Sequence, residues 1–250
     1  MASDRSSSGH DGHDAGRPWP PAVLTDSSGW QMSFGERAAL EGLLAACRPG
    51  LAIEIGTAEG GSLSALAAHS DEVHAIDLAE PKLDPPANVE VHVGDSKAVL
   101  PGLLERLASG GRNVDYVLVD GDHSAAGVRA DLENLLLSPA VAETLIVCHD
   151  TMNEEVRSGI ESVDFAAHPK VRYVELDFVA GYMGRQYPFE GQLWGGLGIV
   201  VVDAASDPGI PGGIDGDPRY YDAHTMLRKR GGPRPLRALR QLIASRRSSG

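Results

Sequence analysis

The stretch Leu51–Ser62 constrains the fold of this chain more than any other part of the sequence. An apolar run is followed there by a turn that contains Gly56, Gly60 and Gly61, and residues 62–68 are suited to open a helix. Such a pattern is typical of a buried strand that leads into a helix. Glycines let the backbone bend sharply and approach a ligand, and a helix N-terminus offers unpaired N–H groups. The stretch predicts a nucleotide-cofactor turn, with an ordinary strand-to-helix turn as the alternative.

Two residues of this turn indicate which cofactor it suits. Glu54 stands two residues before the first glycine, where its carboxylate would repel a pyrophosphate but attract the sulfonium and ammonium groups of S-adenosylmethionine. Ala58 occupies the place of the second glycine in the dinucleotide pattern G-x-G-x-x-G. The turn therefore favours S-adenosylmethionine and argues against a nicotinamide-dependent oxidoreductase.

Length and composition predict one α/β domain with appendages. The chain has 250 residues, of which 42% are hydrophobic, enough for one well-buried domain. Residues 1–30 hold few apolar clusters and are expected to be a flexible leader, 31–217 to form the domain, and 218–250 to be a basic, partly helical tail. We find no signal peptide and no apolar run long enough to span a membrane. Cys47 and Cys148 give no disulfide framework, so we expect a cytoplasmic protein.

The charge of the chain is unevenly distributed. Residues 218–250 carry nine of the 22 lysines and arginines and a single acid, Asp222. The tail therefore carries +8 and the remainder −21, which together give the net charge of −13. So acidic a body argues against a nucleic-acid enzyme. We expect the tail to dock on its own domain, on a partner subunit in a homo-oligomer, or on an anionic membrane.

The order of the expected elements alternates between strand and helix. Beyond the strand that begins at Leu51, strands are expected over 72–78, 89–95, 114–120, 144–149, 171–179 and 198–203. Helices are expected from the capping box Ser33-Phe-Gly-Glu36 to Gly50, over 62–68 and 98–107, around 128–136, and over 156–163. This order predicts an α/β fold with a Rossmann-like, doubly wound, mostly parallel sheet of seven strands. Residues 181–195 contain no helical pattern, so the last two strands should form an antiparallel pair.

Acidic residues end the second and third strands, where an open α/β sheet binds its ligand. Asp77 lies 21 residues after Gly56 and is placed to accept both hydroxyls of a ribose. Asp95 is placed to accept from an adenine amino group, and Ser96 to assist through its backbone N–H. Helix capping is the alternative role for Asp77 and for the Asp95–Ser96 pair.

Ionisable residues also end the fourth and fifth strands. Asp120 and Asp150 could share Mg²⁺ or a similar divalent ion, with His149 beside it. His123 should face the same crevice, with a pKa suited to removing a proton near neutral pH. Two carboxylates can also hold substrate hydroxyls without a metal. We expect Asp122 to cap the following helix.

The loop over residues 181–194 is the expected acceptor site. It contains Tyr182, Tyr187 and Trp194, whose rings can stack on a sugar or an aromatic ring, and Arg185, which can pair with a phosphate or carboxylate. The alternative is that these aromatic side chains simply pin the loop.

Taken together, the motifs Glu-Ile-Gly-Thr-Ala-Glu-Gly-Gly-Ser, Asp-Gly-Asp-His-Ser and His-Asp-Thr resemble the class I S-adenosylmethionine-dependent methyltransferases over residues 33–203. More narrowly, they resemble the branch of cephalosporin hydroxylase and the macrocin and mycinamicin sugar O-methyltransferases. The resemblance implies a seven-stranded sheet with an antiparallel last strand, a Mg²⁺ held by Asp120 and Asp150, and His123 as base. His149 stands where members of this branch have a glutamate, and imidazole is a weak Mg²⁺ ligand. The metal, if one is used, is therefore left open.

The expected reaction is methyl transfer from S-adenosylmethionine to a hydroxyl of a small molecule, a sugar or a natural-product intermediate. A catechol-type phenol O-methyltransferase and a non-catalytic S-adenosylmethionine-binding protein are the alternatives. The residues expected to contact the cofactor are Glu54, Gly56, Thr57, Glu59, Gly60, Ser62, Asp77, Leu78, Asp95, Ser96 and Asp120.

Overall fold

The computed structural model describes residues 29–81, 84–185 and 190–205. Its helices are α2 (Phe34–Cys47), α3 (Gly61–His69), α4 (Ser96–Ser109), α5 (Ala125–Leu137), α6 (Glu154–Glu161) and the 3₁₀ turn η1 (Phe165–Ala167). Its strands are β1 (Leu51–Ile55), β2 (Glu72–Asp77), β3 (Val89–Val93), β4 (Tyr116–Val119), β5 (Glu143–His149), β6 (Val171–Val179), β7 (Tyr182–Met183), β8 (Leu193–Trp194) and β9 (Leu197–Asp203).

The central sheet has seven strands in the order β3-β2-β1-β4-β5-β9-β6. The first five are parallel, whereas β9 runs antiparallel to both β5 and β6. This topology confirms the predicted doubly wound α/β fold and its antiparallel last pair. Because β1 and β4 are neighbours at the point where the strand order reverses, the turn after β1 opens into the crevice where such sheets bind ligands.

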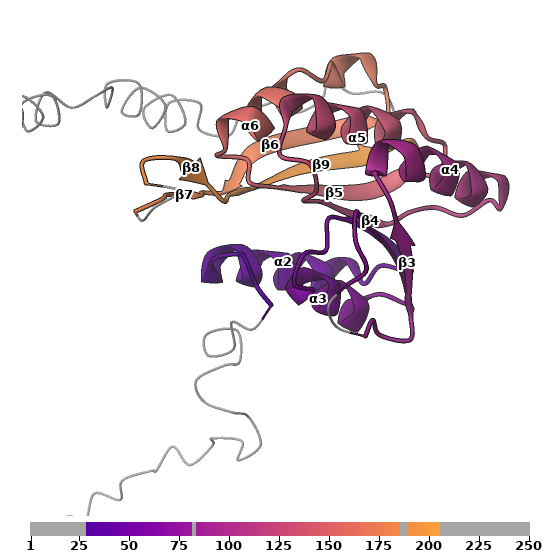
Figure 1. Ribbon diagram of the computed structural model, residues 1–250. Helices are drawn as coiled ribbons and strands as arrows, with labels where there is room; N and C mark the ends of the chain where they lie inside the picture. Colours follow the sequence, from indigo (N-terminus) through magenta and orange to yellow (C-terminus); the bar gives the residue numbers. More distant parts are fainter. Residues whose placement is uncertain (1–28, 82–83, 186–189, 206–250) are drawn as a thin grey trace, which may run out of the picture.

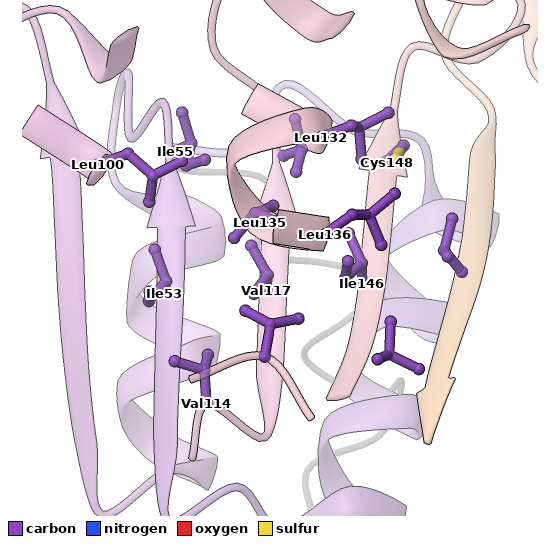
Figure 2. Packing of buried hydrophobic residues seen from close by; sticks show 14 of the residues in the cluster. Ile53, Ile55, Leu100, Val114, Val117, Leu132, Leu135, Leu136, Ile146 and Cys148 are labelled. Atoms are coloured by element: carbon purple, nitrogen blue, oxygen red, sulfur yellow. The ribbon is translucent and has the colours of Figure 1, made fainter. Parts of the chain in front are cut away.

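Helices cover both faces of the sheet (Figure 1). Leucines of α2 and α3 pack with Ala52 and Tyr116 on one face. Leucines of α4 and α5 pack with Ile53 and Ile55 on the other, together with α6. Figure 2 shows this second cluster, in which Leu132, Leu135 and Leu136 of α5 lie over β4 and β5. Since successive strand residues point to opposite faces, Glu54 points to the α2–α3 side with Ala52.

The predicted elements are confirmed with shifts of one or two residues at most ends. The structure adds one feature that the sequence analysis describes only as loop, a short hairpin of β7 and β8. Tyr182 pairs with Trp194 there, and Met183 with Leu193. Two-residue strands carry too little alternation to be recognised from sequence. The hairpin projects over the ends of the strands beside α2 (Figure 1).

Some predictions concern residues beyond the described ranges. Residues 1–28 of the expected leader and the basic tail, 218–250, lie outside them, and so do residues 206–217 of the expected domain. Gly29 and Trp30, which we assigned to the leader, are described: the Gly29 carbonyl accepts a hydrogen bond from the Gly61 N–H at 3.1 Å. Within the described ranges, no helix has the length and apolar character needed to cross a membrane.

Candidate functional site

A cleft with a volume of about 1630 Å³ lies at the carboxyl ends of β1, β2, β4 and β5 and is closed on one side by the β7–β8 hairpin. Ligand pockets for one small molecule usually measure roughly 300–1,000 Å³. This cleft therefore has room for two ligands side by side, such as a cofactor and an acceptor. From our sequence-based set it is lined by Gly56, Asp77, Leu78, Asp95, Ser96, Asp120, His123, His149, Asp150, Tyr182, Arg185 and Trp194.

The turn after β1 has the sharp bend that its glycines predict. Gly56 has φ +87°, and a Cβ at this position would overlap the backbone carbonyl oxygen of Asp120. Glycine is thus required because the chain after β4 packs directly on the turn. Gly60 has φ +85° and is the N-cap of α3, with no side-chain capping bond. Because Gly60 has no side chain, it offers no side-chain acceptor to the first N–H groups of α3.

Asp77 fastens this turn to the end of β2. Its Oδ2 accepts hydrogen bonds from the Thr57 N–H at 2.8 Å, the Thr57 hydroxyl at 3.1 Å and the Ala58 N–H at 3.2 Å. Burial would raise the pKa of Asp77, but the backbone hydrogen bonds from Thr57, Ala79 and Ala58 lower it, so the group is ionised. Asp77 Oδ1 accepts from the Ala79 N–H at 3.1 Å, and its second lone pair is left to accept from a ribose hydroxyl in the cleft.

Glu54 is fully buried under the turn. Its side chain is 0% exposed, and neither carboxylate oxygen has a hydrogen-bond partner of good geometry among the described residues. Burial raises the pKa of Glu54 to about 8, against a smaller opposing effect of the nearby Ser62 hydroxyl. An unpartnered buried carboxyl group is costly. Among the described residues, Glu54 thus lacks a well-placed hydrogen-bond donor, and it lies beneath the turn rather than in the lining of the cleft.

The remaining predicted cofactor residues differ in whether they line the cleft. Asp95 is the N-cap of α4, with Oδ1 accepting from the Lys97 N–H at 2.9 Å, so the capping role and a position on the cleft coincide. Leu78 is 77% exposed beside Asp77 and offers an apolar face to a ligand. Thr57 and Ser62 line a small hollow of about 20 Å³ that shares Asp120 with the cleft. Glu59 and Gly60 line neither space among the described residues.

His149 is the centre of a buried network of acids. Its Nδ1 lies 2.9 Å from Asp120 Oδ1 and 3.5 Å from Asp150 Oδ2, and its Nε2 lies 3.2 Å from Glu36 Oε1. Burial alone would lower the pKa of His149, but the three carboxylates raise it well above its usual value. The imidazole is therefore held as a cation within the acidic cluster.

His123 lies between the two aspartates at the cleft surface. Its Nε2 is 3.2 Å from Asp150 Oδ2 and 3.6 Å from Asp120 Oδ1, and its side chain is 41% exposed. The nearby carboxylates of Asp120 and Asp150 raise the pKa of His123, against the opposing effect of burial. The edge of its ring packs against Trp194, with ring centroids 5.7 Å apart. Of the cluster, His123 is thus the group that solvent and substrate reach most easily.

Asp150 is held in an unusual backbone conformation. Its φ is +55°, a left-handed value that non-glycine residues rarely adopt, although aspartate tolerates it better than most. Its Oδ1 accepts a hydrogen bond from the Gly195 N–H at 2.5 Å. Positive φ at a non-glycine residue costs on the order of 1–3 kcal/mol and concentrates at functional sites. The strain directs the Asp150 carboxylate toward His123 and His149.

Glu36 is a site residue that the sequence analysis did not identify. We predicted it only as the glutamate of the α2 capping box, and that box is present: Glu36 Oε2 accepts from the Ser33 N–H at 2.6 Å. Its other oxygen, Oε1, accepts from the Gly196 N–H at 2.5 Å and contacts His149. Nothing local in the sequence indicates a contact between residues 113 positions apart.

Lys97 and Asp122 extend the polar wall of the cleft. The Lys97 ammonium lies 3.0 Å from Asp122 Oδ2, and Asp122 Oδ1 accepts from the Ser124 N–H. The N-cap of α5 is Ser124, so our prediction that Asp122 itself caps this helix is wrong by two residues. Asp122 instead fixes the turn that precedes the cap.

On the acceptor side, the β7–β8 hairpin brings Tyr182, Arg185 and Trp194 to the cleft wall. The Trp194 indole N–H donates to Gln192 Oε1 at 2.9 Å, which fixes the ring. Tyr187, the fourth predicted acceptor residue, lies outside the described residues.

Residues 53–151 match a family model described as a methyltransferase domain, Methyltransf_24. This match runs from β1 to the end of β5 and so contains the glycine-rich turn and every strand-end acid described above. Together with the order and directions of the seven strands, this match gives the chain the class I methyltransferase fold. A search of curated protein sequences gave no match.

Several solved structures are similar to this chain. An O-methyltransferase from Bacillus cereus, in complex with SAH, has 19% sequence identity and a TM-score of 0.51, over 73% of this chain and 86% of that one. MycE, a methyltransferase of the mycinamycin biosynthetic pathway in complex with Mg, SAH and mycinamycin VI, has 17% identity and a TM-score of 0.48, over 70% of this chain. The present chain spans about half of MycE, 51% of its length.

In this fold, the residues that we predicted as metal ligands and as the base come together. Ligand atoms of Asp120, His149 and Asp150 all lie within 4.8 Å of one another, and His123 approaches two of the three. The cofactor-side residues lie along the same cleft, from the turn after β1 to the ends of β2 and β3.

Proposed function

We propose that this chain is an S-adenosylmethionine-dependent methyltransferase that acts on a hydroxyl group of a small molecule, a sugar or a natural-product intermediate. One observation carries the proposal: His123 lies between two carboxylates at the wall of a cleft that continues along Gly56, Asp77 and Asp95. Methyl transfer to oxygen requires a base and a binding site for the nucleoside part of the cofactor in one cleft.

The cofactor arm suits a ligand that carries both a nucleoside and a positive charge. Asp77 is ionised at the cleft and can accept from ribose hydroxyls, and the exposed Leu78 side chain can cover one face of the adenine. Glu54 has no partner of its own among the described residues, and a cationic ligand above the turn would favour its ionised form. The SAH bound to the Bacillus cereus O-methyltransferase, which shares this fold, supports the same choice of cofactor.

The acid cluster fits a divalent metal of mixed oxygen and nitrogen preference. Asp120, Asp150 and the Nδ1 of His149 would hold it, and the imidazole favours Zn²⁺, Mn²⁺ or a similar ion over Mg²⁺. When bound, such a metal would lower the pKa of an acceptor hydroxyl. The raised pKa of His149 means that a metal would have to displace a proton from this ring.

In the proposed reaction, His123 Nε2 takes the proton of the acceptor hydroxyl. The oxygen attacks the methyl carbon in line with the sulfur, a new C–O bond forms, and the C–S bond breaks with its electron pair left on sulfur. The products are the methyl ether, S-adenosylhomocysteine and a protonated His123, which returns its proton to solvent. Most of the rate enhancement would come from orientation in the cleft, and roughly 10²–10⁴-fold from the base.

The β7–β8 hairpin would select the acceptor molecule. Tyr182 and Trp194 offer ring faces to a sugar or a flat ring, and Arg185 offers a charge for a phosphate or carboxylate of the acceptor. A catechol-type acceptor would use the same acid cluster, with two vicinal hydroxyls in place of one.

The test combines cofactor binding with an acceptor panel. Calorimetry should detect S-adenosylmethionine and S-adenosylhomocysteine but not a nicotinamide dinucleotide, and mass spectrometry of the purified protein should find a carried-over adenosyl ligand. Transfer of labelled methyl groups is then assayed on nucleotide sugars and on catechols. Methylation confined to catechols would replace the proposed acceptor class, and cofactor binding without transfer to any acceptor would favour a non-catalytic binding protein.

A further inference from the structure

A second cluster of metal-ligand side chains lies at the edge of the sheet, away from the cleft lining. It consists of His74 on β2 and of Glu90 and His92 on the edge strand β3. The parallel register places Glu90 beside His74, and His92 beside Ile76, two residues further along. All three side chains therefore point to the same face of the sheet, the one that α4 covers.

The three ligand atoms are separated as they would be around a single ion. His74 Nδ1 lies 2.9 Å from His92 Nε2. Glu90 Oε2 lies 3.6 Å from His74 Nδ1, and Glu90 Oε1 lies 3.6 Å from His92 Nε2. With bonds of about 2.0–2.2 Å to nitrogen and oxygen, a tetrahedral zinc ion holds its ligand atoms roughly 3.3 Å apart. The observed separations of 2.9 and 3.6 Å lie on either side of this value, so the ligand atoms fit one ion without rearrangement of the backbone.

A carboxylate also stands behind one of the two histidines. Glu72 Oε1 lies 3.0 Å from His74 Nε2, the ring nitrogen that faces away from the cluster. Arg112 holds Glu72 through two hydrogen bonds, of 2.8 and 2.9 Å. In metal sites, a ligand histidine usually presents its other ring nitrogen to such a carboxylate, which fixes the ring and its tautomer. The Glu72 carboxylate is within reach of His74 Nε2, although the contact does not have the geometry of a formed hydrogen bond.

The cluster is shielded on its histidine side and open on its carboxylate side. The side chains of His74 and His92 are 5% and 13% exposed. Glu90 is 63% exposed, so an ion can reach the cluster from solvent.

We propose that His74, Glu90 and His92 form a binding site for a divalent transition metal, with Zn²⁺ as the best match. Two imidazoles and one carboxylate suit zinc and exclude Mg²⁺ as the preferred ion, and three protein ligands leave one position to water. The bound ion would clamp the edge strand β3 to β2, three residues before Asp77. The site is independent of the methyl-transfer cluster and does not depend on the proposed function.

The experiment is a zinc titration of the metal-stripped, full-length protein against a chromophoric chelator. We expect His92→Ala and Glu90→Gln each to weaken one zinc site by at least about tenfold, whereas His168→Ala, outside both clusters, leaves it unchanged. The double variant Asp120→Asn/Asp150→Asn disables the cleft cluster and should retain the edge site. Zinc should also raise the melting temperature of the double variant, and adding Glu90→Gln to that variant should abolish the rise.

The exposed position of Glu90 means that Glu90→Gln tests the site even if His92→Ala does not fold. Zinc that binds with unchanged affinity to both of these variants would overturn the proposal, whether it occupies the cleft cluster or His10 and His13 near the N-terminus. A hydrogen bond between the two rings would then be the whole function of the His74–His92 pair.

Discussion

At the scale of single residues, Glu54 is a buried group whose charge is poorly stabilised by the described residues around it. Its pKa of about 8 compares with an ordinary value of 4.5, so the folded protein binds a proton that the unfolded chain has already lost. For a carboxyl group with a raised pKa, stability is greatest below pH 4.5 and declines as the pH rises toward about 8. The same group should pass to its ionised form when a cation binds above it.

We predict that Glu54→Gln stabilises the ligand-free protein at pH 8 and weakens S-adenosylmethionine binding. The shift corresponds to a cost on the order of 4 kcal/mol at pH 8, of which the amide avoids the part due to ionisation. Urea unfolding at pH 5 and pH 8 measures the first effect and calorimetry the second. Glu105→Gln, on the exposed side of α4, is the control. A variant less stable than the wild type at pH 8 would refute a neutral Glu54.

A second residue-scale prediction concerns His123. The neighbouring carboxylates raise its pKa, so the base should be unprotonated only above a pH higher than its usual 6.5. Turnover should therefore fall as the pH drops through that raised value. Asp150→Asn should shift this fall in turnover to lower pH. Because the ionisable groups of the cluster interact, the apparent pKa of this fall belongs to the cluster as a whole rather than to the His123 ring.

His123→Ala should reduce turnover by roughly 10²-fold or more, with S-adenosylmethionine affinity nearly unchanged. Steady-state rates across pH and a binding isotherm measure the two quantities. Equal losses of turnover and cofactor affinity would make His123 a binding or structural residue instead.

At the scale of elements, Asp77 has two roles. It holds the turn between β1 and α3, and we expect it to bind the ribose of the cofactor. Asp77→Ala should weaken S-adenosylmethionine by about 1.5–3 kcal/mol, because a charge-assisted bond to the ribose is lost and the Thr57–Ala58 backbone loses its acceptor. Asp77→Asn retains an acceptor for the turn but not the charge, so its loss should be smaller. Calorimetry on both variants measures this. Unchanged affinity in Asp77→Ala would place the ribose elsewhere.

The elements themselves were largely predictable from sequence, and the cluster was predictable in part. The buried strands read as apolar runs, and the alternation of strand and helix fixes a parallel sheet. The parallel sheet in turn brings Asp120, His123, His149 and Asp150 to one edge. Glu36 could not be found this way, because its contact with His149 depends on how α2 packs against the end of β5. The β7–β8 hairpin escaped because two-residue strands show no period.

At the scale of the whole molecule, removal of metal should separate chemistry from structure. If a divalent ion binds the cleft cluster, exhaustive chelation should lower turnover about 10²-fold, since Lewis-acid stabilisation amounts to several kcal/mol. Zn²⁺ or Mn²⁺ should restore activity better than Mg²⁺. His92→Ala should show the same loss and the same recovery, because the edge site lies apart from the reaction. Full activity after chelation would leave the protonated His149 as the only cation of the cluster.

The basic tail offers a further test at this scale. A chain shortened to end at Asp217 should retain cofactor affinity, because every predicted cofactor residue lies between Glu54 and Asp120. Its assembly state should become less sensitive to salt, since exposed ion pairs are screened within about 10 Å at 0.1 M. Light scattering and cofactor titration measure the two. Lost cofactor binding would show that residues 218–250 complete the domain.

The double use of Glu36 links the start of the domain to its chemistry. One oxygen of its carboxylate belongs to the first turn of α2, and the other holds His149 and the Gly196 backbone in place. Fraying of that first turn would therefore remove one of the carboxylates that hold the imidazole, although no strand-end residue had moved. Helix α2 and the acid cluster should form a single cooperative unfolding unit, and amide protons at the start of α2 and at Gly195 and Gly196 should exchange at a common rate. Catalytic competence would then be a direct readout of whether the first helix is folded.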